Sequence, residues 1–359
     1  MTEVHVIVPE GIDDPARPSG GNTYDRRVCA ELAALGWTVR EHAVPDAAAL
    51  ARAVRRMPEG AVVLLDGLIA STAPEALVPH AGRLRQVVLV HMPLGHRPPK
   101  GQAGAVRTRE REVLAAATAI VTTSAWGRRR LRELYALPDE RVHVAEPGVD
   151  AAPLAHGSLA GDALLCVAAV TPDKGHDVLL DALAMAADLP WRCTCVGSLV
   201  RAPALADAVR HQARDSGLGE RVQFPGPRTG EELDRAYAAA DLLVHPSLAE
   251  TYGMVVTEAL SRGLPVLATD VGGVREALGH GEEGVRPGLL VPPGDSAALA
   301  AALRAWLEDA ELRDRLRRAA RERRATLRPW AATASAVADV LAGVVASAEG
   351  LAGLAGAPR

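Results

Sequence analysis

Lysine is almost absent from this chain of 359 residues, in which 40 residues are Lys or Arg but only Lys100 and Lys174 are lysines. Arginine has taken nearly every other cationic position, so a lysine that persists is a candidate for a specific contact. The charges of the two signs nearly balance, and the formal net charge is -4. This balance argues against a nucleic acid partner, and we expect none.

Cysteine is also scarce, and no spacing typical of a metal or redox motif relates its four positions, Cys29, Cys166, Cys193 and Cys195. The three in the second half lie in apolar runs and are expected in the core. We see no metal-ligand constellation and expect no tightly bound metal. The sequence also lacks a charged leader before "VHVIVP" and any run of ~20 apolar residues. These absences predict a cytoplasmic protein, with peripheral contact at the inner face of a membrane as an alternative.

Short apolar runs alternate with helical patterns along the whole chain. The expected strands are Val4–Val8, Thr38–Val44, Ala61–Asp66, Gln86–His91, Ala119–Thr123, Arg141–Ala145, Ala163–Val170, Trp191–Val196, Arg221–Phe224, Leu242–His245, Pro265–Ala268 and Leu289–Val291. The helical stretches include Thr23–Leu35, Ala105–Ala117, Ala125–Ala136, Asp177–Ala187, Pro203–Ser216, Glu231–Ala240, Gly253–Arg262 and a long helix from Ser296. Apolar strands that alternate with helices predict α/β domains whose parallel sheets are covered on both faces.

The periodicity stops once, at Pro147–Ala163, where Gly, Pro and Ala dominate. We therefore expect two doubly wound Rossmann-like domains, an N-terminal one at 1–152 and a C-terminal one at 153–330. Residues 331–359 are expected to form a C-terminal helix that packs back toward the first domain. Ligands of such folds bind at the carboxyl ends of the strands, so we expect the two domains to face a central cleft.

Two glutamates, Glu250 and Glu258, stand eight positions apart in "ETYGMVVTE". On one helix they would lie roughly 80° apart and would not share a stripe. We instead expect Glu250 on a loop after a strand and Glu258 about one turn into the next helix. The amides of 253–255 would then point where an anion docks, and carboxylates suit sugar hydroxyls. The alternative is a solvated loop acid and a helix acid stabilised by the macrodipole.

The first half offers other possible contacts. In "PSGGNTY" the pair Gly20 and Gly21 permits close backbone approach to a ligand, although most glycine pairs belong to ordinary loops. His91 ends the apolar run "QVVLVHM", where a core histidine is the ordinary alternative. A basic segment follows in "GHRPPKG"; its residues His96, Arg97 and Lys100 would contact an acceptor or a phosphate, or else form a solvated loop.

Two helical stretches, Arg107–Glu112 and Trp126–Tyr135, are rich in arginine. Their simpler interpretation is a solvated face, and the alternative is docking on an anionic membrane. The "RERR" near Arg321–Arg324 is interpreted as a solvated face of a long charged helix.

The segment "PSLAETYGMVVTEALSRGLPVLATDVGGVREAL" resembles the signature of retaining nucleotide-sugar glycosyltransferases with the GT-B fold, of glycosyltransferase family 4 (group 1). Other matches stand in the same order as in that family. They are "TTSAWGRRRLRELYALPDERVHVAEPGVD" at the end of the first domain, the lysine loop "VTPDKGHDVLLDAL", then "VQFPG" and "GLLVPPGD". A single Glu-x7-Glu would be a weak signal, but this many matches in order is a specific one.

The resemblance implies a role for each matching residue. His91, Lys174 and Glu250 would be catalytic, acting respectively on the transferred sugar, the diphosphate and the sugar hydroxyls. The implied donor-binding residues are Gly20, Gly21, Lys174, Gly197, Phe224, Gly226, Glu250, Gly253, Met254, Val255 and Glu258. Of these, Glu258 would bind the ribose hydroxyls. The chain departs from the family at Ala169, where an arginine is common, so what completes the phosphate clamp stays open.

The resemblance thus predicts a retaining glycosyltransferase that uses a nucleoside-diphosphate sugar, with UDP or GDP as the expected carrier and no tightly bound cofactor. The acceptor is a small molecule, a glycan or a lipid, and the sequence predicts neither it nor the oligomeric state. Retention would follow from attack on the same face, with the leaving phosphate as the base. The alternatives are another GT-B enzyme, such as an epimerase or a phosphorylase, and a non-catalytic module that binds sugar nucleotides.

Overall fold

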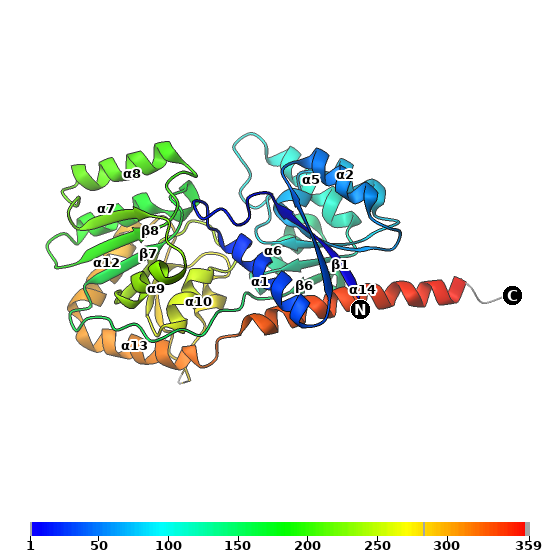
Figure 1. The fold of residues 1–359 in the computed structure, drawn as a ribbon. Helices are drawn as coiled ribbons and strands as arrows, with labels where there is room; N and C mark the ends of the chain where they lie inside the picture. Colours follow the sequence, from blue (N-terminus) through cyan, green and yellow to red (C-terminus); the bar gives the residue numbers. More distant parts are fainter. Residues whose placement is uncertain (1, 283, 356–359) are drawn as a thin grey trace. The chain divides into compact units, whose positions relative to one another are not determined.

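A computed structural model describes residues 2–282 and 284–355 of the chain (Figure 1). The chain divides into two compact units. The second unit comprises Asp13–Gly20 and Val149–Pro329, and the first unit comprises the other described residues. Within the described residues each unit holds one six-stranded parallel sheet, so the predicted pair of doubly wound α/β domains is confirmed.

The first unit is built on strands β1 to β6. These are β1 (Glu3–Pro9), β2 (Thr38–Val44), β3 (Val62–Asp66), β4 (Arg85–Val90), β5 (Ala119–Thr122) and β6 (Val142–Val144). Its helices are α1 (Gly20–Ala34), α2 (Ala47–Arg56), α3 (Gly67–Ala70), α4 (Pro74–Leu77), α5 (Ala103–Ala116), α6 (Ala125–Tyr135) and α14 (Trp330–Ala355). The strand order is β2-β1-β3-β4-β5-β6.

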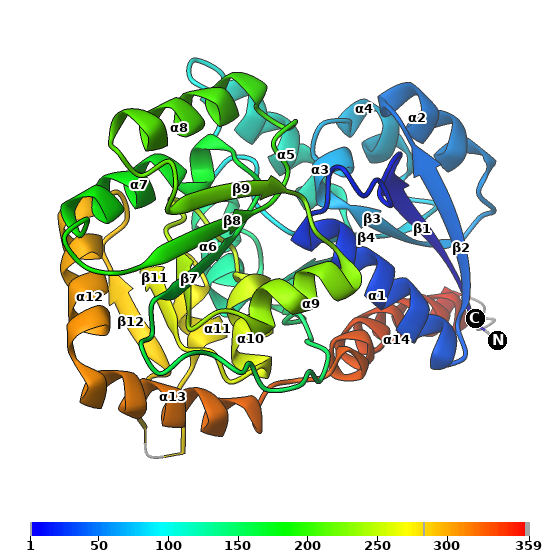
Figure 2. The same ribbon diagram turned by 60° about the vertical axis from the view of Figure 1, so that its left-hand side comes forward.

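Both faces of this sheet are buried, which explains why its strands are apolar throughout. Alternate residues such as Val63 and Leu65 of β3 join one core cluster with Leu50 of α2, Leu114 of α5 and Leu131 of α6. The intervening strand residues are buried as well, and α14 packs on β3, β4 and β5. In Figure 2 the helix α14 lies beside α1, away from α2 and α4.

The second unit is built on strands β7 to β12. These are β7 (Ala163–Val167), β8 (Arg192–Val196), β9 (Val222–Gly226), β10 (Leu242–His245), β11 (Val266–Thr269) and β12 (Gly288–Val291). Its helices are α7 (His176–Met185), α8 (Pro203–Asp215), α9 (Gly230–Ala238), α10 (Met254–Ser261), α11 (Val274–Leu278), α12 (Ser296–Glu308) and α13 (Ala310–Arg324). The sheet order is β12-β11-β10-β7-β8-β9.

The strand orders fix where each unit can bind a ligand. In the second unit successive strands run outward from β7 in one direction and from β10 in the other, so the order reverses between β7 and β10. In the first unit the reversal falls between β1 and β3. Crevices for ligands open at such switch points, outside the carboxyl ends of the strands. The loops after β7 and β10, and those after β1 and β3, are therefore the places to examine.

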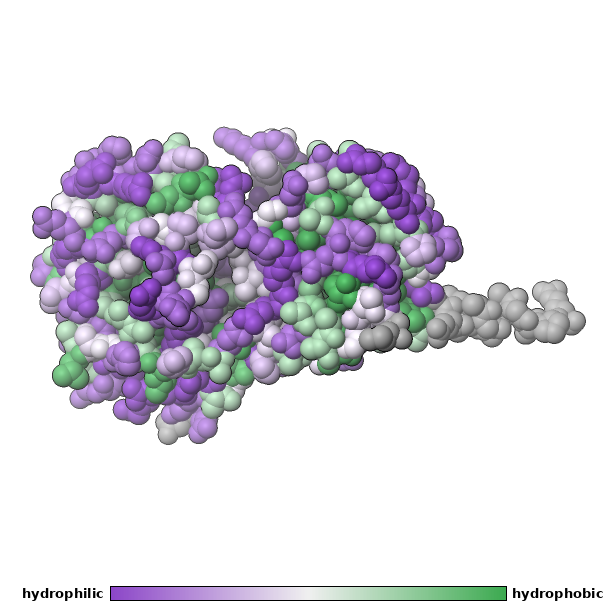
Figure 3. All heavy atoms as spheres, viewed as in Figure 1, coloured by the Kyte–Doolittle hydropathy of each residue, from purple (hydrophilic) through white to green (hydrophobic). Residues whose placement is uncertain are grey.

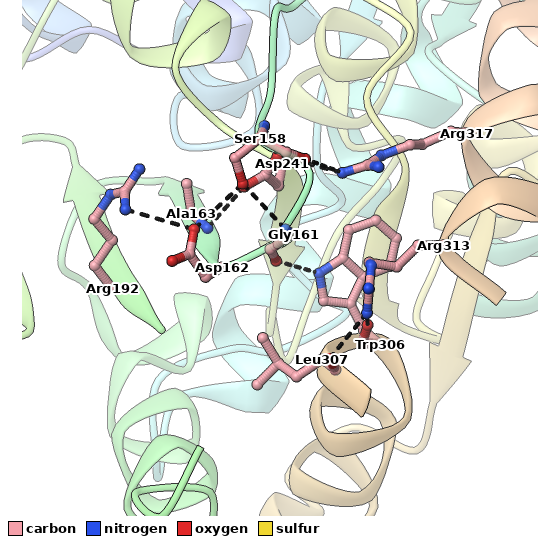
Figure 4. Close-up of polar contacts among 10 residues, drawn as sticks. All are labelled: Ser158, Gly161, Asp162, Ala163, Arg192, Asp241, Trp306, Leu307, Arg313 and Arg317. Atoms are coloured by element: carbon pink, nitrogen blue, oxygen red, sulfur yellow. Dashed lines mark hydrogen bonds and ion pairs between the residues drawn. The ribbon is translucent and has the colours of Figure 1, made fainter. Parts of the chain in front are cut away.

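A buried carboxylate anchors the chain where it enters the second sheet (Figure 4). Asp241, whose side chain is fully buried, accepts hydrogen bonds from the Ser158 hydroxyl (2.8 Å) and the Ala163 amide (2.9 Å). Arg317 of α13 lies 3.4 Å from the same carboxylate. The Trp306 indole donates to the Gly161 carbonyl at 2.7 Å. Together these bonds hold the segment before β7 against α12 and α13.

The structure bears out the twelve expected strands and corrects some helices. The long helix expected from Ser296 is wrong, because the chain breaks at Asp309 into α12 and α13. The Asp309 carboxylate accepts from the Leu312 amide and so caps the second helix. The solvated face expected for 321–324 is also wrong in part, since Arg324 donates to the Ser261 and Ala152 carbonyls.

Candidate functional site

Glu250 and Lys174 meet at the switch point of the second unit. Lys174 follows β7, and Glu250 follows β10, the neighbouring strand. The Lys174 Nζ lies 2.5 Å from Glu250 Oε1. His245 Nε2 lies 3.1 Å from that oxygen, and the Ser247 hydroxyl donates to it at 3.2 Å. Lys174, His245 and Ser247 thus all approach the same carboxylate oxygen, Oε1.

The charges of this cluster are mutually stabilised. Burial alone would raise the pKa of Glu250, but the Lys174 charge and the hydrogen bonds from His245 and Lys174 outweigh it and lower that pKa far below its usual range. Burial would likewise lower the pKa of Lys174, and the Glu250 carboxylate raises it instead. The Glu250 side chain is 12% exposed and that of Lys174 24%. A carboxylate and an ammonium thus coexist, both charged, at a nearly buried position.

Two glycines let the backbone approach closely enough to build this cluster. Gly175 has φ +65°, and a Cβ on it would lie 2.2 Å from the Pro246 carbonyl oxygen. Gly272 has φ +56°, and a Cβ there would lie 1.6 Å from the Glu250 carbonyl oxygen. A side chain at either position would push apart the loops that carry Lys174 and Glu250. This explains "DKG" and the first glycine of "DVGG".

Glu258 occupies the fifth position of α10, one turn and a half beyond the glycine that starts the helix. The Tyr237 hydroxyl donates to Glu258 Oε2 at 2.8 Å, and burial raises the pKa of the carboxyl. The Arg262 guanidinium covers the Tyr237 ring at 4.5 Å. Gly253 precedes α10 with φ +94° and no side-chain cap, as expected for the amides of Met254 and Val255 to face a ligand.

The other residues expected to bind the donor lie nearby in the second unit. The Gly197 amide donates to the Gly226 carbonyl at 3.1 Å, joining the ends of β8 and β9. A Cβ on Gly197 would lie 1.9 Å from the Ala168 carbonyl oxygen. Phe224 packs against the core from β9. Gly20 also belongs to this unit. It lies close to Met254, because a Cβ at position 20 would lie 3.3 Å from the Met254 sulfur.

His91 is the centre of a second polar cluster, in the first unit. Its Nε2 lies 2.7 Å from Asp25 Oδ1. A ligand atom from each of Asp25, Asp66 and His91 lies within 4.8 Å of the others. A Cβ on Gly21 would lie 3.3 Å from His91 Cδ2, and the Tyr24 ring meets the imidazole edge-on at 5.2 Å. The glycine-rich turn thus approaches the histidine directly.

The two carboxyl groups determine the charge of this cluster. Burial alone would lower the pKa of His91, but the Asp25 and Asp66 charges raise it above its ordinary value. Burial raises the pKa of Asp66 to about 6. The three side chains have the spacing that a metal ion could use, although no metal is expected from the sequence. His91 Nε2 and Asp25 Oδ1 lie within hydrogen-bond distance of each other.

The basic segment after His91 is held by a buried carboxylate. Glu110 of α5, fully buried, accepts from the Leu94 and Gly95 amides at 2.9 and 2.8 Å. His96 accepts from Arg130 Nε at 3.0 Å, and the charges of Arg130 and Arg97 add to burial in lowering its pKa. Of the three acceptor candidates, His96 is thus bound to α6, whereas Arg97 and Lys100 are exposed.

Several arginines of the two basic helices are engaged within the first unit. Arg107 donates to the Gly95 carbonyl, Arg109 pairs with Glu75, and Arg128 pairs with Asp139. On the face drawn in Figure 3, hydrophilic side chains gather over α2 and α8, and hydrophobic ones form small separate patches. Among the described residues, no helix has the length and hydropathy needed to cross a membrane.

Four residues of these clusters were not predicted from the sequence: Asp25, Asp66, Tyr237 and His245. Asp25 had a detectable signal, because it falls in the buried stripe of α1 with Tyr24, Val28 and Leu32, where an acid is out of place. The other three became visible only through their contacts in the fold.

Two Rossmann-like units, with these polar clusters at the ends of their strands, define a protein of the GT-B fold class. Solved structures of that class superpose along the whole chain. Sucrose-phosphate synthase from Thermosynechococcus elongatus is 22% identical, with a TM-score of 0.79 over 97% of this chain and 100% of that one. Anabaena HepE in complex with UDP-glucose is 19% identical, with a TM-score of 0.74 over 96% and 100%.

The family follows from the sequence comparisons. Residues 160–323 match the model of glycosyl transferases group 1, and residues 2–152 match that of glycosyltransferase family 4. The chain therefore belongs to the group 1 glycosyltransferases of family 4. A D-inositol 3-phosphate glycosyltransferase of Nocardia farcinica is 37% identical over 58% of this chain and 48% of its own length. That of Jonesia denitrificans is 33% identical over 65% and 58%. The chain thus spans about half to three-fifths of these curated relatives.

Proposed function

We propose that this protein transfers a glycosyl group from a nucleoside-diphosphate sugar to a hydroxyl acceptor with retention of the anomeric configuration. The observation that carries the proposal is the pairing of Lys174 with Glu250 at the switch point of the second unit, 2.5 Å apart. One cation for the diphosphate and one carboxylate for the sugar stand side by side there. Glu258 lies on the adjoining helix, within reach of a third part of the same ligand.

Each group has a chemical task in this reaction. As the glycosidic bond to the diphosphate breaks, negative charge grows on the leaving oxygen, and Lys174 with the amides at the start of α10 stabilises it. Glu250 accepts hydrogen bonds from the sugar hydroxyls. Glu258 accepts from the ribose hydroxyls, and the Gly197–Gly226 junction meets the base. His91 binds the transferred sugar.

The state of the carboxylates supports attack on the same face. A double displacement needs a free carboxylate nucleophile with a partner acid about 5–5.5 Å away. In the described part of the second unit, Glu250 is occupied by Lys174 and Glu258 by Tyr237. In the described part of the first unit, Asp25 is bound to His91. Each of these carboxylates is engaged by a neighbouring side chain, which supports our proposal that the departing phosphate is the base for the incoming hydroxyl.

The donor and acceptor follow from the relatives by analogy. HepE is described in complex with UDP-glucose, which favours UDP as the carrier. The curated relatives are named for an inositol phosphate acceptor. An acceptor that carries an anionic group would suit the exposed Arg97 and Lys100 that follow His91 in the chain. We therefore favour a UDP-sugar donor and a polyol acceptor with a phosphate or carboxylate group.

The test begins with a thermal-shift screen of UDP-, GDP- and ADP-sugars, because a ligand that binds only the folded state raises its stability. The donor found is then incubated with polyol phosphates and neutral polyols, and release of the nucleoside diphosphate is measured. Proton NMR of the product reads the anomeric configuration. A product of inverted configuration would refute retention. Donor binding without turnover on a broad acceptor panel would favour a non-catalytic module, and a new sugar nucleotide formed without acceptor would favour an epimerase.

A further inference from the structure

Asp25 has no part in the roles assigned so far, yet it is among the most constrained polar groups in the first unit. It lies on the first turns of α1, directly after the glycine-rich turn, and its side chain is 3% exposed. Its Oδ1 lies 2.7 Å from His91 Nε2. Its Oδ2 is buried and has no hydrogen-bond partner among the described residues. An acid this deep requires a specific reason, because burying a carboxylate is costly unless it is paired.

The contact with Asp25 determines which nitrogen of His91 is available. Nε2 of His91 is hydrogen-bonded to Asp25 Oδ1 within the described part of the chain. Nδ1 is not among the buried polar atoms that lack a partner, and the side chain is 12% exposed. The ring nitrogen that can meet a ligand is therefore Nδ1. In a histidine, the bond made by one ring nitrogen decides the protonation of the other.

Neighbouring groups fix the plane of the imidazole. The ring packs closely on Gly21, because a Cβ at position 21 would lie only 3.3 Å from His91 Cδ2. The Tyr24 ring packs against it at 75°, and the Tyr24 hydroxyl donates to the Ala145 carbonyl at 2.9 Å and does not compete for His91. The ionisable groups that act on the imidazole are Asp25 from α1 and Asp66 from the end of β3. Both are carboxyl groups, and both favour a proton on each ring nitrogen.

We propose that Asp25 is a positioning residue for the glycosyl transfer, which binds Nε2 of His91 so that Nδ1 donates an N–H to an oxygen of the substrate. The substrate contact in this inference rests on the proposed function, whereas the pairing of Asp25 with His91 does not. No bond is formed or broken by Asp25, and no proton leaves His91 in this role. The carboxylate holds the ring and keeps it cationic while charge develops on the donor.

The first test needs no substrate. Proteins labelled with ¹⁵N-histidine are titrated by NMR, with His91→Gln used to assign the His91 signals. We expect the wild type to show a protonated Nε2 and a titration midpoint above that of an ordinary histidine. Asp25→Asn should lower that midpoint, because the charge that favours the imidazolium is gone. The matched control is Glu41→Gln, which removes an exposed acid paired with Arg26 of the same helix and should leave the midpoint unchanged.

The second test uses the donor and acceptor found by screening. We expect Asp25→Asn to lower kcat by roughly 10²-fold, the scale of a lost general acid or charge-stabilising group, while the KM for the donor changes less than about 3-fold. The high-pH limb of the kcat profile should move to lower pH. The double variant Asp25→Asn/His91→Gln should be no slower than His91→Gln, because both act through one group. Circular dichroism and thermal unfolding confirm that each variant folds.

Specific results would overturn the inference. An unchanged His91 midpoint in Asp25→Asn would do so, as would fully additive losses in the double variant. So would one equivalent of divalent metal in the purified protein, measured by plasma mass spectrometry and lost in Asp25→Asn, since the cluster would then be a metal site. If no donor supports transfer but the NMR result holds, the proposed function fails and the pairing stands. If transfer occurs and the His91 midpoint does not move in Asp25→Asn, the proposed function stands and the role of Asp25 fails.

Discussion

Lys174 is proposed to have two roles in the second unit, and replacing it by alanine removes both. It removes the ammonium expected to stabilise the leaving diphosphate, and it also removes the nearest cation from Glu250. The variant should therefore lose turnover and stability together. The double variant Lys174→Ala/Glu250→Gln keeps the shape of the Glu250 side chain and removes its charge.

The stability loss can be estimated from the geometry. Two unit charges about 2.5 Å apart attract by about 6–7 kcal/mol at an effective dielectric constant of about 20, before desolvation is subtracted. Removing one partner of a buried pair typically costs about 3–5 kcal/mol. The two side chains are 24% and 12% exposed, and His245 still lies 3.1 Å from the carboxylate. We therefore expect about 2–3 kcal/mol, below the usual range for a fully buried pair.

The measurements are denaturant unfolding at neutral pH and turnover with the natural donor. Lys174→Ala should unfold more easily and be slower by roughly 10²–10³-fold in kcat, the effect of losing one group that stabilises charge in the transition state. The Lys174→Ala/Glu250→Gln variant should regain most of the stability and none of the turnover. Arg304→Ala, which breaks an exposed pair with Asp188 on the same unit, is the control and should change both little.

Near-normal turnover of Lys174→Ala with the donor that the wild type uses would refute the phosphate role. Recovery of turnover in the double variant would show that the lysine only neutralises Glu250. The pH range matters for the interpretation. The lowered pKa of Glu250 gives stability that is present above the ordinary pKa of a glutamate and is lost as pH falls through the lowered value. The raised pKa of Lys174 gives stability that is lost only as pH rises through it, so neutral pH shows the full effect.

Three further predictions concern other parts of the chain. Tyr237→Phe removes the hydrogen bond to Glu258, so we expect the KM for the donor to rise about 3–10-fold with kcat nearly unchanged, the scale of one typical lost hydrogen bond. A change in kcat alone would contradict the ribose role. The pKa of Asp66 is raised to about 6, so the folded state binds its proton more tightly, and ionisation of this group lowers stability as pH rises from about 4 to 6. Asp66→Asn should therefore raise the Tm at pH 7.5 but not at pH 4. Equal shifts of the Tm at both pH values would refute this. Because several arginines of α5 and α6 are paired internally, we expect co-sedimentation with liposomes to be no stronger for anionic than for neutral lipid; stronger binding to anionic lipid would restore the membrane interpretation.

Most of the fold could be predicted because the sheet faces are buried. Strands that are covered on both sides must be apolar throughout, and this is visible in the sequence as short uninterrupted runs. The ends of helices are set by single polar contacts, which periodicity does not contain. Asp309 illustrates this, because it divides one charged helical pattern in two by capping the Leu312 amide. The membership of Asp13–Gly20 in the second unit also had no signal, since it depends on contacts such as that from Ser198 to the Ala16 carbonyl.

The site was predicted unevenly for a similar reason. Glu250, Glu258 and Lys174 stand in contiguous motifs, so their neighbours along the chain identify them. Tyr237 is 21 residues from its partner Glu258, and Asp25 is 66 residues from His91. Neither pairing has a local pattern, and each arises from helices and strands that meet only in the folded unit. Local motifs thus identified Glu250, Glu258 and Lys174 as candidates, and the fold was needed to find the side chains that contact them.

The departure at Ala169 gains a physical meaning from the contacts of Glu250. Where the family commonly has an arginine this chain has Ala169, so in the proposed function Lys174 would serve both the diphosphate and the Glu250 carboxylate. The Glu250 Oε1 has three donors close to it: Lys174, Ser247 at 3.2 Å and His245 at 3.1 Å. If Lys174 turns toward a phosphate, the other two still hold the carboxylate in place. His245, 2% exposed and fixed at the end of β10, can therefore release the lysine for the donor without releasing Glu250. In the proposed function, Ser247 and His245 close to Glu250 would thus compensate for the missing second cation at the phosphate.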